Sequence, residues 1–94
     1  MRIVLNKCYG GFAVSTYAWA TLGIDPDDLP SQLRVNPALI EALTEFGADT
    51  SVYNGPCAKL VVVEIPRNTT DWHVIEYDGY EQLVYVVNGK LHFA

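Results

Sequence analysis

The dipeptide Asn88-Gly89 restricts the fold of this chain more than any other feature of the sequence. Asn followed by Gly is the pair preferred in two-residue type I′ turns, because both central residues of such a turn need positive φ angles. It joins two runs rich in apolar, β-branched and aromatic residues, at 80–87 and 90–93. The sequence therefore predicts a β-hairpin at these positions.

Three further segments have the patterns of strands. Residues 72–77 alternate between apolar and polar side chains, and the turn pair Asp78-Gly79 links them to the hairpin. Residues 59–65 form a continuous apolar run that is short enough for a strand buried on both faces. An opening strand is predicted at 2–8, ending at Gly10-Gly11, where the chain can adopt unusual backbone angles.

Two helices are predicted between the opening strand and the run at 59–65. The first covers 15–22, with Ser15 as its N-terminal cap and Gly23 as its stop. The second covers 37–46 and starts at Asn36-Pro37, where Asn caps the free amides and Pro occupies the first helical position. Residues 24–35, with two prolines and three aspartates, are predicted to form a connecting loop with about one turn of helix.

The order of these elements indicates an α+β fold. Helices come early and antiparallel strands come late, so we expect two short helices packed on one face of a mixed, mainly antiparallel sheet of four to five strands. A chain of 94 residues leaves little room for a second hydrophobic core, and a single domain spanning 1–94 is expected.

Charge and hydropathy exclude several classes of function. The formal net charge is −5 and the basic residues do not cluster, which argues against binding to duplex nucleic acid. No segment approaches the length of a membrane span, and the first residues lack the pattern of a secretory signal. A cytoplasmic location is therefore expected, with Cys8 and Cys57 as reduced thiols.

The segment Lys7-Cys-Tyr-Gly-Gly-Phe12 suggests a binding site for a small anion such as a nucleotide. Two glycines between a strand and a helix cap allow backbone amides to approach an anion. The predicted ligand-binding residues are amide donors, cations and aromatic rings: Lys7, Tyr9, Gly10, Gly11, Phe12, Arg34, Lys59, Arg67 and Trp72. Alternatively, the two glycines only permit a sharp turn, since the segment matches no established phosphate-binding motif.

The segment Glu76-Tyr-Asp-Gly-Tyr-Glu81 suggests a surface for a protein partner. It places three carboxylates and two tyrosines at a junction between strand and turn, a composition that suits docking on a basic protein. Glu76, Asp78, Tyr80 and Glu81 are the predicted contact residues. Like-charge proximity between two of these carboxylates could also raise the pKa of one of them enough for acid–base catalysis. A solvated turn with flanking acids is the simpler interpretation.

Catalytic and metal sites are less favoured alternatives. Cys8 and His73 could form a thiol–imidazole pair if the fold brings them together. Adding Cys57 and His92 would give four potential zinc ligands, but these lack the close pairing that is typical of structural zinc sites. We therefore expect no metal, no cofactor and no catalytic residues.

The two singled-out segments, together with Val63-Glu-Ile-Pro66 and Trp72, resemble a family of small proteins found in phage and prophage genomes. Members of that family combine an N-terminal KCYGGF-like motif with a VEIP, W and EYDG.E series. Residues 83–94 depart from the charged ending that those proteins often have. The resemblance implies a phage accessory protein that acts in the host cytoplasm, with an anti-defence role.

Binding is thus favoured over catalysis. The first expectation is a non-enzymatic anti-defence protein that sequesters a small anionic ligand such as a nucleotide signal. The alternatives are an acidic inhibitor that masks a host defence protein, and a small hydrolase that uses Cys8 and His73 or paired carboxylates. Leu91 and Phe93, on a predicted edge strand, are candidates for pairing with a second copy of the chain.

Overall fold

The structure is a computed structural model that describes residues 1–25, 27–46, 53–55 and 58–94, with the exception of the Phe46 side chain. Its elements in chain order are β1 (Arg2–Asn6), α1 (Thr16–Leu22), α2 (Pro30–Leu33), α3 (Pro37–Phe46), β2 (Leu60–Glu64), β3 (Thr69–Tyr77), β4 (Tyr80–Val87) and β5 (Lys90–Phe93). The predicted α+β class is confirmed.

The helices begin where the capping residues predicted. The Ser15 side chain accepts a hydrogen bond from the amide of Ala18 at the start of α1. Asn36 Oδ1 accepts from the amides of Ala38 and Leu39, at 2.9 and 3.1 Å, at the start of α3. These bonds satisfy amides that have no partner within the helix, which fixes where each helix starts. The predicted loop at 24–35 contains α2 as its turn of helix.

Both predicted hairpin turns are also present. Asn88 and Gly89 have φ angles of 53° and 75° between β4 and β5, as a type I′ turn requires. Asp78 and Gly79 have φ angles of 50° and 88° between β3 and β4. The two turns make β3, β4 and β5 a continuous antiparallel meander.

The strands are divided between two sheets, whereas a single sheet was expected. β1 pairs only with β2, and β3-β4-β5 form a separate antiparallel sheet. The division is explained by the edge of β1 that does not pair with β2, because Arg34 occupies that edge. The Val4 amide donates to the Arg34 carbonyl at 2.9 Å, and Arg34 Nη1 donates to the Val4 carbonyl at 3.1 Å. A further strand cannot pair at these positions.

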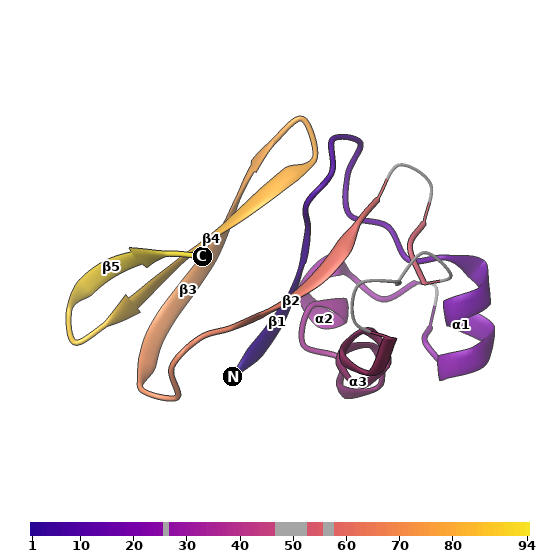
Figure 1. The fold of residues 1–94 in the computed structure, drawn as a ribbon, viewed down its shortest axis with the longest axis horizontal. Coiled ribbons are helices and arrows are strands. Elements are labelled where there is room, and N and C mark those ends of the chain that lie inside the picture. The colour runs from indigo at the N-terminus through magenta and orange to yellow at the C-terminus, as the bar shows by residue number, and fades with distance from the viewer. Residues whose placement is uncertain (26, 47–52, 56–57) are drawn as a thin grey trace.

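The β1-β2 ribbon forms the middle of three layers, between the helices and the β3-β4-β5 sheet (Figure 1). Successive side chains of β1 point to opposite layers. Val4 packs with the helices, and Ile3 and Leu5 pack with the sheet. All three are fully buried, because β1 is covered on both faces. The expected single core is therefore two clusters, one on each face of the ribbon.

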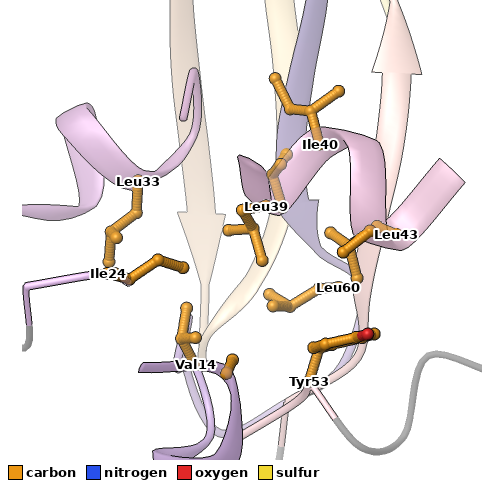
Figure 2. Close-up of a cluster of buried hydrophobic side chains, with 11 residues drawn as sticks. Val14, Ile24, Leu33, Leu39, Ile40, Leu43, Tyr53 and Leu60 are labelled. Carbon is orange, nitrogen blue, oxygen red and sulfur yellow. The ribbon is translucent and has the colours of Figure 1, made fainter. Parts of the chain in front are cut away.

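The cluster on the helix side holds most of the buried apolar residues. Figure 2 shows side chains from α2, α3, β2 and the connecting segments converging on one centre. The cluster on the sheet side is smaller and consists of Ile3, Leu5, Ile65 and Leu83, with Trp72, Val74 and Tyr85 packed against it. It holds the three-stranded sheet against the ribbon.

Candidate functional site

The two segments singled out in the sequence, the 7–12 loop and the 76–81 turn, lie against each other. The Gly10 amide donates to the Asp78 carbonyl at 2.9 Å, and Lys7 Nζ donates to the Glu81 carbonyl at 2.7 Å. Figure 1 shows the connection after β1 beside the turn between β3 and β4. The sequence predicted two separate candidate sites, and the structure brings them together in one.

Asn6 is the residue that joins these two segments. Its backbone amide donates to Glu81 Oε1 at 2.7 Å. Its side-chain Nδ2 donates to the backbone carbonyls of Cys8 and Gly79 at 2.8 and 2.7 Å. Asn6 Oδ1 accepts from the Lys59 amide at 2.8 Å. Asn6 is fully buried, so its own donor or acceptor group in each of these hydrogen bonds is shielded from solvent. Sequence reasoning missed Asn6, although a polar residue at the end of the apolar run Ile3-Val-Leu was a signal.

Arg34 and Glu81 form a buried ion pair beside Asn6. Nη2 lies 2.5 Å from Oε2 and Nη1 lies 2.7 Å from Oε1, and the two side chains are only 9% and 3% exposed. The Phe12 ring covers the guanidinium, with 4.5 Å between its centroid and Cζ. The structure therefore corrects two predictions: Arg34 is not available to bind a ligand, and Glu81 is not part of an acidic surface.

The predicted amide cradle for an anion does not hold for Gly10, because its amide already donates within the protein. The backbone of the neighbouring turn also packs directly against this loop. A Cβ added to Gly79 would lie 2.6 Å from the Gly10 nitrogen and closer still to the Gly11 nitrogen. The absence of a side chain at Gly79 thus allows two backbone segments to pack in direct contact, whereas a Cβ on Gly11 would meet no atom within 4 Å. Gly10 and Gly11 have positive φ angles of 132° and 106°, which fits the simpler interpretation of the sequence, a sharp turn.

The remaining predicted ligand-binding residues are not all gathered at this loop. Lys59 is exposed and lies next to Lys7, whose amide donates to the Lys59 carbonyl at 2.8 Å. Arg67 precedes β3, whose nine residues separate it from the turn by roughly 25–30 Å at about 3.3 Å per residue. Trp72 is half-buried against the sheet-side cluster, where it has a packing role.

One groove, of about 450 Å³, lies beside the start of α3. Its walls are formed by Arg2, Val35, Pro37, Ile40 and Glu41. None of the predicted ligand-binding residues lines this groove, so it gives no support to the predicted nucleotide site.

The joined segments expose aromatic rings on their outer side. The Tyr9 and Tyr80 rings lie 5.4 Å apart between centroids, and Lys7 Nζ lies 5.3 Å from the Tyr80 centroid. Tyr77 is the cross-strand partner of Tyr80. Tyr9 is 62% exposed, Tyr77 73% and Tyr80 40%. We call these three residues the tyrosine cluster.

Carboxylates flank the tyrosine cluster. Glu76 and Asp78 are exposed and adjoin Tyr77 in the chain, at the end of β3. Glu76 pairs across the strands with Glu81, so its side chain leaves the strand on the opposite face from Tyr77 and Tyr80. Asp78 lies beyond the strand in the turn, with a φ of 50°, so it does not share a strand face with Glu76. The result is a surface of exposed tyrosines with an acidic rim, built on two turns that are held together by buried hydrogen bonds.

The catalytic alternatives find no geometric support in the described residues. The Cys8 thiol donates to the Tyr9 carbonyl at 3.6 Å, and His73 Nε2 lies 3.0 Å from Asp71 Oδ2 on β3. No hydrogen bond joins Cys8 and His73 in the part of the chain that the structure describes. Glu76 faces Glu81 across the strands, but Glu81 is paired with Arg34.

The described residues contain no group of three or more His, Cys, Asp or Glu side chains that could hold a metal ion. Cys57, which was considered as a zinc ligand, lies outside the described residues. Among the described helices, none has both the length and the apolar character needed to cross a membrane.

The fold and the site define a small α+β domain that presents a tyrosine cluster on two interlocked turns. Comparisons with protein-family models, with curated proteins and with solved structures gave no significant match.

Proposed function

We propose that this protein is a non-enzymatic binding protein that docks its tyrosine cluster on a basic surface of another protein. The observation that carries the proposal is the exposure of Tyr9, Tyr77 and Tyr80 on neighbouring backbone segments, with the exposed carboxylates of Glu76 and Asp78 adjoining Tyr77 in the chain. Tyrosine is enriched at protein interfaces because its ring contributes a large apolar area and its hydroxyl forms hydrogen bonds.

The rigidity of the supporting turns favours this function. Exposed rings lose less conformational entropy on binding when the backbone beneath them is already ordered. Here the 7–12 loop and the 76–81 turn are tied through Asn6 and Glu81. A net charge of −5 would speed association with a basic partner and would make that association sensitive to salt.

A small anionic ligand, the first expectation from the sequence, has less support. Arg34 and the Gly10 amide are occupied within the protein, and Arg67 lies at the far end of β3. The resemblance to phage proteins suggests that the partner is a host protein in the host cytoplasm and that masking it serves an anti-defence role.

The proposal can be tested by quantitative capture of partners from a host lysate with tagged protein. The variant Tyr9→Ser/Tyr77→Ser removes two strongly exposed rings, and we expect it to lose the partners that the unmodified protein enriches. Tyr17→Ser is the matched control, because Tyr17 is 55% exposed on α1, outside the cluster. Retention of the same partners by the double variant would refute the proposal.

The acidic rim is tested by reversing one charge. Glu76→Lys should weaken capture of the same partners, and added salt should reduce the difference from the unmodified protein. Glu41→Lys makes the same change in net charge at an exposed position of α3, and capture should remain close to normal. Equal losses with both variants would show that only overall charge matters. A melting temperature raised by free nucleotides would instead favour the small-ligand alternative.

A further inference from the structure

Strand β5 has one edge that is paired and one that is open. The Leu83 amide donates to the Ala94 carbonyl at 3.1 Å, and the Ala94 amide donates back to Leu83 at 2.8 Å. Because hydrogen-bonded pairs alternate along an antiparallel ladder, the backbone groups of His92 also point to β4, and those of Leu91 and Phe93 point away. Within the described part of the chain, no strand pairs with this open edge.

The side chains on the open edge are apolar and exposed. Leu91 is 67% exposed and Phe93 is 63% exposed. Their cross-strand partners are Val86 and Val84, so all four side chains share the face of the sheet that points away from the ribbon. A run of unpaired backbone groups beside exposed apolar side chains is a template for pairing with another strand.

Two other edges, those of β3 and β1, are protected against such pairing. The β3 edge has a bulge between Thr69 and Asp71, and the exposed Asp71 and His73 side chains pair there. Arg34 covers the β1 edge. Residues 90–93 carry one charge, Lys90, at the start of the strand, and β5 has neither a bulge nor a proline.

We propose that β5 pairs in antiparallel orientation with β5 of a second copy, so that the two three-stranded sheets form one six-stranded sheet. In the register that uses the open groups, His92 faces His92 of the other copy across the two-fold axis. Leu91 then forms a hydrogen-bonded pair with Phe93 of the other copy, and the reverse pair forms on the other side of the axis.

The second copy is the favoured occupant for two reasons. The open edge is self-complementary, since the same short strand supplies both hydrogen-bonded pairs and places Leu91 against Phe93 on the apolar face. In addition, two chains that each carry a net charge of −5 repel each other, and β5 offers contact without any acidic side chain. The tyrosine cluster, at the other end of β4, remains free for a different partner.

The dimer is expected to depend on concentration. A four-residue strand with two large exposed side chains buries less than the roughly 800 Å² per partner that is typical of stable complexes. Sedimentation equilibrium of the full chain should therefore show a reversible monomer–dimer exchange.

Proline at position 91 gives the sharpest test of the open edge. Leu91→Pro removes an amide that the β4–β5 ladder does not use, so the monomer should fold with an unchanged circular dichroism spectrum and the dimer should be lost. Leu91→Thr is the matched control, because it removes the Leu side chain but keeps the amide and a strand-favouring residue, and it should retain measurable dimer. A monomer at every concentration, or a dimer that survives Leu91→Pro, would overturn the proposal.

The register can be tested by disulfide trapping in a Cys8→Ser/Cys57→Ser background. His92→Cys places two thiols across the axis at a non-hydrogen-bonded pair, with Cα atoms about 4.5 Å apart, within the range a disulfide can bridge. Oxidation should therefore yield a covalent dimer. Leu91→Cys should yield far less, because residue 91 faces residue 93 of the other copy. Equal trapping at both positions would contradict this register.

Discussion

Arg34 and Glu81 form a bidentate ion pair that joins the end of α2 to β4 across the covered edge of β1. Their charges are buried, and Glu81 also accepts from the Asn6 amide. The pair connects the helix layer to the three-stranded sheet, which otherwise meets the ribbon mainly through the small sheet-side cluster. The position of the tyrosine cluster depends on this link.

Breaking the ion pair should strongly destabilise the protein. Glu81→Gln leaves Arg34 buried without its counter-charge, and a loss of about 3–5 kcal/mol in the free energy of unfolding is expected. Glu76→Gln is the matched control, since Glu76 is the exposed cross-strand partner of Glu81 and should change stability by less than about 0.5 kcal/mol. Urea denaturation measures both. Similar small effects would mean that the pair does not hold the layers together.

Gly79 should tolerate no side chain. In Gly79→Ala the new Cβ would collide with the backbone of Gly10 and Gly11, and the φ of +88° adds strain. Gly89→Ala is the control, because its φ of +75° is similar but its Cβ would meet open space. We expect Gly89→Ala to cost about 1 kcal/mol from backbone strain alone, and Gly79→Ala to cost clearly more in thermal unfolding. Equal costs would show that the two turns are not in close contact.

Asn6 should contribute more to the stability of the fold than the small size of its side chain suggests. Asn6→Ala removes the partners of the Lys59 amide and of the Cys8 and Gly79 carbonyls. Since each buried polar group left unpaired costs about 1–3 kcal/mol, the variant should lose at least about 2 kcal/mol of stability. Hydrogen exchange should also accelerate in the 7–12 loop. Asn68→Ala, at an exposed turn position, should change neither measurement.

Stability should fall at alkaline pH in a way that depends on Tyr53. Burial raises the pKa of the Tyr53 phenol above its ordinary value of 10.0, with smaller contributions from Tyr17 and Glu45. The folded protein therefore holds this proton more tightly than the unfolded chain does. The resulting stabilisation is complete below pH 10 and is lost as the pH rises through the pKa of the folded state.

Comparison with Tyr53→Phe isolates this effect. The unmodified protein should lose stability more steeply than Tyr53→Phe above pH 10, while their difference stays constant at lower pH. Denaturation at a series of pH values gives both slopes. Parallel slopes would contradict a raised pKa at Tyr53.

Local signals in the sequence were sufficient for most elements. Asn36-Pro37 located the start of α3, and Asn88-Gly89 located the final turn, because capping and turn geometry depend on residues that are adjacent in the chain. The predicted candidate segments, 7–12 and 76–81, were also the segments that the structure brings into the site. Their roles differed from the prediction, since Gly10 and Glu81 make contacts within the protein.

The sequence by itself determined the α+β class, the helices, the hairpins and the presence of two unusual segments, since each follows from periodicity, caps and turn residues within a short stretch. Only the tertiary structure decided that the strands form two sheets, that Glu81 is buried with Arg34, and that Tyr9 lies beside Tyr80. These outcomes depend on contacts between residues tens of positions apart. The choice between a solvated and a paired carboxylate is made by packing, which no local pattern records.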